Sequence, residues 1–305
     1  MKRTNLVRRF ACIMLLLLFP VMPSWAFAAE NWHVDNISRA LEASALPQAA
    51  QADVKLRAAA AINAGVPAED VEIIVSRGLN RGADAGAINR FLEISVSAKR
   101  SGLPVGPVLD RIEQGLSKSV PAERIAAASE HLTEKLMAAR PLVDALIRDG
   151  MTSRRSTERE KAIEATARAL ERSIPVDAIE GMGSAVRGKR GSLTLFTSAV
   201  DTATYFAGSG MSSKTASRLV QSAVEKGSSE WDLNTMVRRM AEEMKQGTKA
   251  EDAAAKMEHE SKNKNMMNDE RGMERQQDMH QEMRTDHGGG GGSGPSMGGM
   301  GGRGR

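Results

Sequence analysis

The residues of this chain that are best suited to binding a metal ion gather near its C-terminus. His259, Met266, Met273, His280 and His287 follow one another at intervals of seven residues, which would place them along one side of a helix. Residues seven apart on a helix lie about 10 Å from each other, which is too far for both to hold one ion. The full pattern therefore cannot form a single site.

Only a smaller cluster within this pattern is compact enough to hold an ion. Met279, His280, Met283 and His287 lie within nine consecutive residues, mostly three or four apart. Thioether and imidazole groups are ligands of soft ions such as Cu(I) and, by extension, Ag(I). We therefore predict these four residues as a soft-metal site. The alternative is a solvated tail in which they bind nothing.

The sequence offers little catalytic chemistry. Cys12 is the only cysteine, and His33 and His131 are the only histidines before residue 259. Residues 29–247 contain neither the G-x-S-x-G nor the G-x-x-x-x-G-K-[ST] pattern. We expect the protein not to be an enzyme and to need no cofactor for catalysis. A hydrolase of an unrecognised family is the alternative.

Two basic stretches could contact an anionic surface. Arg154 and Arg155 stand in one stretch, and Arg187, Lys189 and Arg190 stand in the other. Phospholipid headgroups or a polysaccharide would suit such side chains. Nucleic acid is not expected as a partner. Four of the 42 Lys and Arg residues and none of the 38 Asp and Glu residues fall within residues 1–28, so the rest of the chain is formally neutral.

The N-terminus has the pattern of a Sec-type signal peptide. Four basic residues precede an apolar run over residues 10–22, and the small residues Ala26 and Ala28 follow it. The run is shorter than the roughly 20 residues of a membrane span. We expect cleavage after Ala28, export to the periplasm or the exterior, and no membrane span in the chain that remains. A membrane anchor is the alternative.

A unit of about 37 residues recurs through the middle of the chain. Its clearest mark is a Gly-apolar-Pro triplet that precedes an apolar run, as in Gly65-Val66-Pro67 and Gly102-Leu103-Pro104. Counted from the third residue of the triplet, the intervals between successive units are 37, 37, 34, 37 and 37 residues. The six positions so aligned are Pro67, Pro104, Pro141, Pro175, Ser212 and Lys249.

Each part of the unit has a local physical reason. Apolar residues at helical spacing precede the triplet, glycine can end a helix in the left-handed conformation, and proline suits the start of the next helix. One unit is then a helical hairpin, which buries its apolar stripe only by stacking on the next copy. We predict an all-α fold of about six hairpins, arranged as an α-solenoid-like array or as a compact helical bundle.

These patterns define four expected segments. They are a signal peptide (1–28), a helical repeat domain (29–247), a charged Met- and His-containing tail that is partly helical or disordered (248–287), and a flexible Gly-rich end (288–305). We expect an exported, non-enzymatic scaffold of the cell envelope that binds another envelope protein or a second copy of itself. The alternatives are Cu or Ag buffering by the tail, and the hydrolase considered above.

Overall fold

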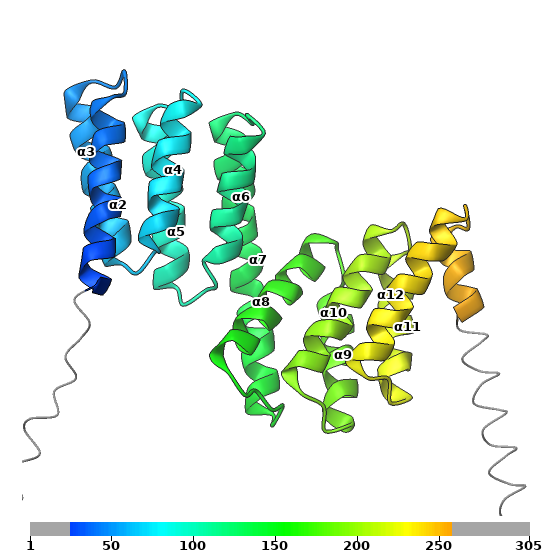
Figure 1. Cartoon of the computed structure of the whole chain (residues 1–305). Coiled ribbons are helices and arrows are strands. Elements are labelled where there is room, and N and C mark those ends of the chain that lie inside the picture. Colours follow the sequence, from blue (N-terminus) through cyan, green and yellow to red (C-terminus); the bar gives the residue numbers. More distant parts are fainter. Residues whose placement is uncertain (1–24, 258–305) are drawn as a thin grey trace, which may run out of the picture.

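The protein is all-helical over residues 25–257, the part of the chain that the structure, a computed structural model, describes (Figure 1). A further helix covers residues 250–257. The labelled helices are α2 (Trp25–Glu42), α3 (Gln48–Asn63), α4 (Ala68–Asn80), α5 (Ala85–Arg100), α6 (Gly106–Ser117), α7 (Ala122–Arg148), α8 (Ser156–Glu171), α9 (Val176–Gly188), α10 (Leu193–Gly208), α11 (Ser213–Glu225) and α12 (Glu230–Lys245). The prediction of an all-α fold is confirmed.

In four of the six units, the turn between the two helices is built as the triplet predicts. Gly65 takes φ +88°, and the amide of Val66 donates to the carbonyl of Ala61 at 3.1 Å, which closes the end of α3. Val66 is buried, and Pro67 occupies the N-cap of α4. The same turn follows at three later glycines with positive φ, namely Gly102, Gly210 and Gly247.

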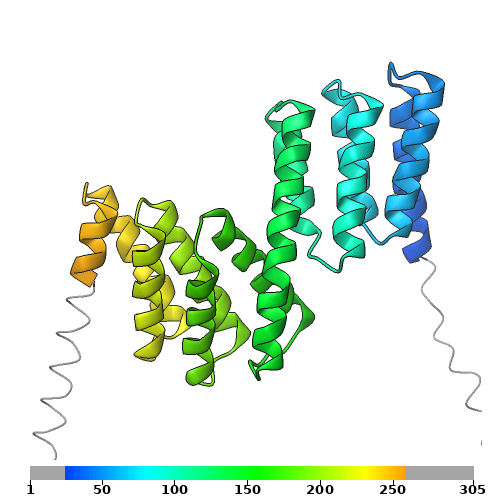
Figure 2. The same ribbon diagram turned by 180° about the vertical axis from the view of Figure 1, so that it is seen from behind.

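The helices lie in two layered rows. In the first array, α2, α4 and α6 pack side by side, and α3, α5 and the N-terminal half of α7 form the second row (Figure 1). In the second array, α8, α10 and α12 form one row, and α9 packs against α11. Figure 2 shows the two arrays from behind, joined along α7.

Glycines in the middle of the chain let successive units approach closely. A Cβ on Gly115 would lie 2.6 Å from Cγ1 of Ile125, and one on Gly78 would lie 3.0 Å from Cγ1 of Ile88. In the sequence, an apolar-x-x-Gly pattern recurs at Val75–Gly78 and Ile112–Gly115 and predicts that both glycines end their helices. That expectation is wrong, because Gly78 and Gly115 lie inside α4 and α6, where the absent side chain admits an isoleucine of the next unit.

The third unit departs from the predicted hairpin. Pro141 was expected to begin a second helix after a turn, but α7 runs for 27 residues straight through it. Two residues before the proline stands Ala139, which is buried and has no glycine-like freedom to take positive φ. Pro141 is exposed, and the helix continues through it because the C-terminal half of α7 is held by its packing against α8.

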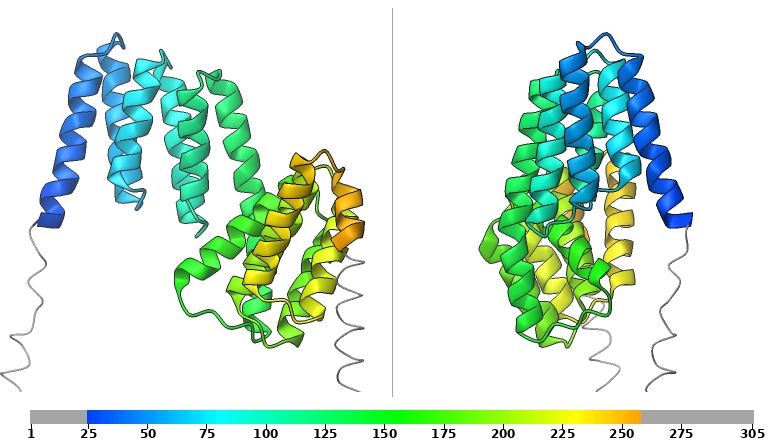
Figure 3. Two further views of the ribbon diagram at one scale, coloured as in Figure 1. Left: turned by 45° about the vertical axis from the view of Figure 1, so that its right-hand side comes forward. Right: turned by 90° about the vertical axis from the view of Figure 1, so that its left-hand side faces the viewer.

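The unbroken α7 displaces the second array. Because α7 does not turn back at Pro141, α8 folds against its C-terminal half, and the later helices are stacked from there. The first array thus packs on the N-terminal half of α7 and the second array on the C-terminal half. This offset gives the molecule the bent outline seen in Figure 3. Arg159 of α8 fixes this junction by donating to Asp144 of α7 from Nε at 2.7 Å and from Nη2 at 2.9 Å.

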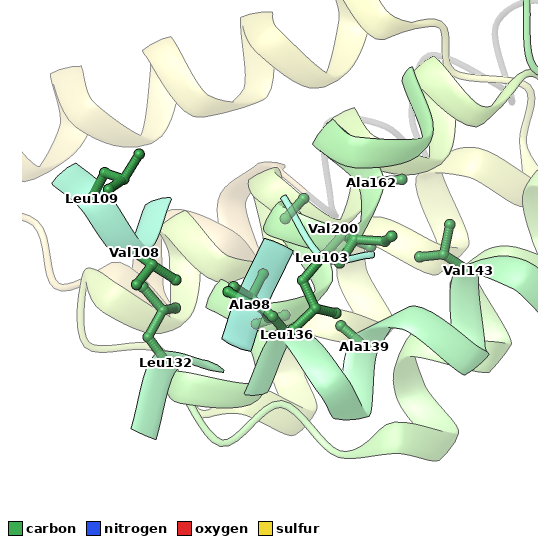
Figure 4. Packing of buried hydrophobic residues seen from close by; sticks show 14 of the residues in the cluster. Ala98, Leu103, Val108, Leu109, Leu132, Leu136, Ala139, Val143, Ala162 and Val200 are labelled. Carbon is green, nitrogen blue, oxygen red and sulfur yellow. The ribbon is translucent and has the colours of Figure 1, made fainter. Parts of the chain in front are cut away.

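One apolar core continues through this junction. Leu103 comes from the first array, Leu136 and Val143 from α7, and Ala162 and Val200 from the second array (Figure 4). All five side chains are buried, so α7 contributes to the cores of both arrays. This shared core explains how a single helix can join them without a linker.

The packed helices extend beyond the expected end of the repeat region at residue 247. In the helix of residues 250–257, Ala253, Ala254 and Met257 are buried. Residues 258–305, which include most of the predicted tail, lie outside the described part of the chain, as do residues 1–24 of the predicted signal peptide. Residues 25–28 begin α2. None of the helices of residues 25–257 combines the length and apolar character needed to cross a bilayer.

Candidate functional site

The candidate site is a groove on the first array, between α5 and α7. Its volume is about 640 Å³. A second hollow of about 480 Å³ lies on the other side of α5. Glu93 and Ser97 line both hollows, so the second hollow is continuous with the groove. The groove between α5 and α7 is lined by Gly86, Asn89, Arg90, Glu93, Ile94, Ser97, Glu130, Thr133 and Glu134.

Asn89 is the unusual member of this lining. Its side chain is 9% exposed, and Nδ2 donates to Oδ2 of Asp53 on α3 at 2.5 Å. Its amide oxygen, Oδ1, is buried and has no hydrogen-bond partner among the described residues. A buried carbonyl oxygen without a partner is unfavourable by about 1–3 kcal/mol. A donor that reached this oxygen, from a bound water or from a ligand, would remove this penalty.

The charged side chains of the groove are held in place by neighbouring helices. Arg90 Nε and Nη2 each donate to Glu130 of α7 at 2.9 Å, and Arg57 of α3 pairs with Glu93. Glu134 is exposed, and among the described residues its one charged contact is with His131, at 3.7 Å. With Asn89, the three glutamates make the groove rich in acceptors, so a ligand with N–H donors or a positive charge suits it.

A second cleft, of about 450 Å³, lies where α6, α7 and α8 meet. Arg111 Nη2 donates to Glu171 across it at 3.3 Å. Burial raises the pKa of Glu164 above its usual value, and the charge of Arg168 partly opposes that shift. These ion-paired groups are explained by the junction of the two arrays and do not require a ligand.

The predicted site residues have different outcomes. Met279, His280, Met283 and His287 lie outside the described residues, so the soft-metal site stays a prediction. Within residues 32–257, no group of three or more His, Cys, Asp and Glu side chains could hold a metal ion. The two basic stretches, with Arg154, Arg155, Arg187, Lys189 and Arg190, are brought together at one end of the second array, where the bridge between Thr152 and Ser192 joins their loops.

Our sequence reasoning missed the groove. Asn89 could have been found, because it is a polar residue beside the buried positions Ile88 and Leu92 of an apolar helix stripe. Its pairing with Asp53 one unit earlier had no signal in the sequence.

Comparison of the chain with protein-family models, with curated proteins and with solved structures gives no match.

Proposed function

We propose that this protein is an exported, non-enzymatic scaffold of the cell envelope that holds a peptide segment of another envelope protein. The proposed place of binding is the groove between α5 and α7, and the unpartnered oxygen of buried Asn89 is the observation that carries the proposal. Helical arrays commonly present extended faces to their partners. Export rests on the signal-like pattern of residues 1–28.

The lining of the groove favours a peptide that carries lysine or arginine. A cationic side chain entering the groove would meet Glu93 and Glu134 and could donate to Asn89 Oδ1. Hydrogen bonds to charged groups contribute about 1.5–3 kcal/mol, so one such contact raises affinity about tenfold or more. Acidic peptides would instead be repelled by the glutamates.

The proposal is tested with a random peptide library and purified protein. We expect selected peptides to be enriched in Lys and Arg and to bind Asn89→Leu at least about tenfold more weakly, because leucine supplies no acceptor. Asn234→Leu makes the same change at an exposed position of α12 and is the matched control. Thermal unfolding of both variants separates loss of binding from loss of folding.

Charge reversal gives a second, independent measurement. Glu134→Lys keeps an exposed side chain but places a positive charge in the groove, so it should weaken basic peptides and leave the unfolding transition nearly unchanged. Selection of peptides without basic residues, or equal binding by wild type and Asn89→Leu, would reject the groove as the site. Binding of a second copy of the chain is checked by sedimentation equilibrium.

A further inference from the structure

Two loops that are distant in the sequence form one surface at the end of the second array. Thr152, after α7, and Ser192, after α9, form a parallel bridge, and the amide of Leu193 donates to the carbonyl of Thr152 at 2.9 Å. Both loops follow helices that end at the lower side of this array in Figure 1. The bridge therefore holds residues 153–155 beside residues 189–191.

This surface carries four exposed cations, which we call the basic cluster: Arg154, Arg155, Lys189 and Arg190. Within residues 32–257, none of the four side chains forms an ion pair, and the one carboxylate beside them, that of Glu158, accepts from the backbone amide of Arg154 at 2.8 Å. Neighbouring cations differ in this respect, because Arg187 donates to Asp149 at 2.6 Å. The basic cluster is therefore a local excess of positive charge on a chain that is formally neutral after residue 28.

We propose that the basic cluster docks this protein on an anionic phospholipid surface. The four side chains are exposed on connected loops, and no buried polar group lies among them to enclose a single small anion. Such an arrangement suits a broad layer of negative charge. Each Lys or Arg near an anionic leaflet raises binding about fivefold, so four act together to raise it several hundredfold.

The choice of phospholipid rests on the proposed export, because an exported protein meets a lipid leaflet. Nucleic acid is disfavoured, since the cluster has no aromatic side chain on which a base could stack. Docking by these loops would leave the groove free, because the groove lies between α5 and α7 and the basic cluster lies on the loops after α7 and α9. The lipid and the peptide could then be bound at the same time.

The test is co-sedimentation of the full chain with vesicles. Vesicles of phosphatidylglycerol and phosphatidylcholine are compared with vesicles of phosphatidylcholine alone, and the ratio of the two affinities is the readout, because it cancels any apolar contribution that all variants share. We expect wild type to prefer the anionic vesicles by about a hundredfold or more, and this preference to fall steeply as salt is raised.

Two variants of equal charge make the test specific. One replaces the four residues of the basic cluster with Gln, and the other replaces four exposed cations elsewhere: Lys55, Lys118, Arg124 and Lys214. The first should lose nearly all of the preference, whereas the second should keep most of it. Equal losses in the two variants, or no preference in wild type, would overturn the proposal.

Two further arms keep the outcomes distinct. A soluble anionic polysaccharide that binds the wild type more tightly than the vesicles do would reject the lipid as partner. Asn89→Leu should bind vesicles like wild type, and peptide binding is measured without vesicles. A failure of the lipid proposal is thus distinguishable from a failure of the proposed groove.

Discussion

The two arrays use the same hairpin period and both carry ion pairs between units, but the first has more of them and the cores are filled differently. In the first array, arginine and glutamate side chains bridge successive units, through the pairs Arg57–Glu93, Arg77–Glu113 and Arg90–Glu130. In the second array, one such pair, Arg168–Asp201, joins α8 to α10. The α8 helix presents a run of fully buried alanines to the core, and α10 fills that core with Phe196 and Phe206.

This difference shows that the repeat determines the course of the backbone but does not determine which side chains fill the core between units. Small alanines let α8 and α10 approach closely around large aromatic rings. We therefore expect the stability of the second array to depend on the close packing of these side chains. The first array has polar bridges on its outer face, and the groove lies among them.

Removing a ring from the second array should have the largest effect. Phe196→Ala empties a fully buried position, and such changes lower the free energy of unfolding by about 3–5 kcal/mol. Urea denaturation followed by circular dichroism measures the loss. Tyr205→Ala removes a 38% exposed ring from the same helix and should lose clearly less. A decrease in the free energy of unfolding below about 1 kcal/mol for Phe196→Ala would contradict the proposed role of close core packing.

Replacing the proline of α7 should stabilise the protein. Proline inside a helix is about 3 kcal/mol less favourable than alanine, so Pro141→Ala should raise the free energy of unfolding by up to about that amount. Pro175→Ala, at the N-cap of α9, is the control and should give no such gain. If Pro141→Ala destabilised the protein in the same denaturation experiment, the residue would lie in a turn and the two arrays would not be joined by one helix.

Adding one methyl group to the first array should test its close approach between units. Gly115→Ala places a Cβ against Ile125 and should lower the free energy of unfolding by about 1–3 kcal/mol. Gly188, at the end of α9, has open space around it, so Gly188→Ala should be neutral or slightly stabilising. Thermal melting of the two variants side by side gives the comparison. Equal melting temperatures would mean that Ile125 gives way without strain.

Breaking a polar bridge of the first array should have a small effect. Arg90 and Glu130 are about half exposed, and exposed ion pairs contribute about 0.2–1 kcal/mol. A double-mutant cycle with Arg90→Ala and Glu130→Ala should give a coupling within that range, falling as salt is added. A coupling of about 3 kcal/mol would show instead that these bridges dominate the stability of the first array.

The junction should respond weakly to pH. The hydrogen bonds of Arg159 lower the pKa of Asp144 in the folded protein, with a further contribution from Arg140, although burial opposes the shift. A carboxyl with a lowered pKa stabilises the fold above its unfolded pKa, and this stabilisation is lost as pH falls through its folded pKa. Denaturation at a series of acidic pH values should show this loss in wild type and a smaller loss in Asp144→Asn. Identical profiles would show that the pair does not stabilise the junction.

The hairpin turns could be predicted because their cause is local. Gly65 and Gly102 permit a left-handed backbone wherever they stand, and the neighbouring prolines fix the next helix start. The turn predicted at Pro141 does not form because of a tertiary contact: the C-terminal half of α7 is held by its packing against α8. The pairing of Asn89 with Asp53 depends on how two units stack. The meeting of the two basic stretches depends on a bridge between loops, and neither contact leaves a periodic mark in the sequence.

The uninterrupted α7 has a mechanical consequence. Its 27 residues span about 40 Å, and its two halves are clamped in different arrays. A force that tilts one array must therefore bend the α7 helix, because there is no flexible loop between the arrays that could act as a hinge. A force applied at the groove, in the first array, would therefore be transmitted through α7 to the second array.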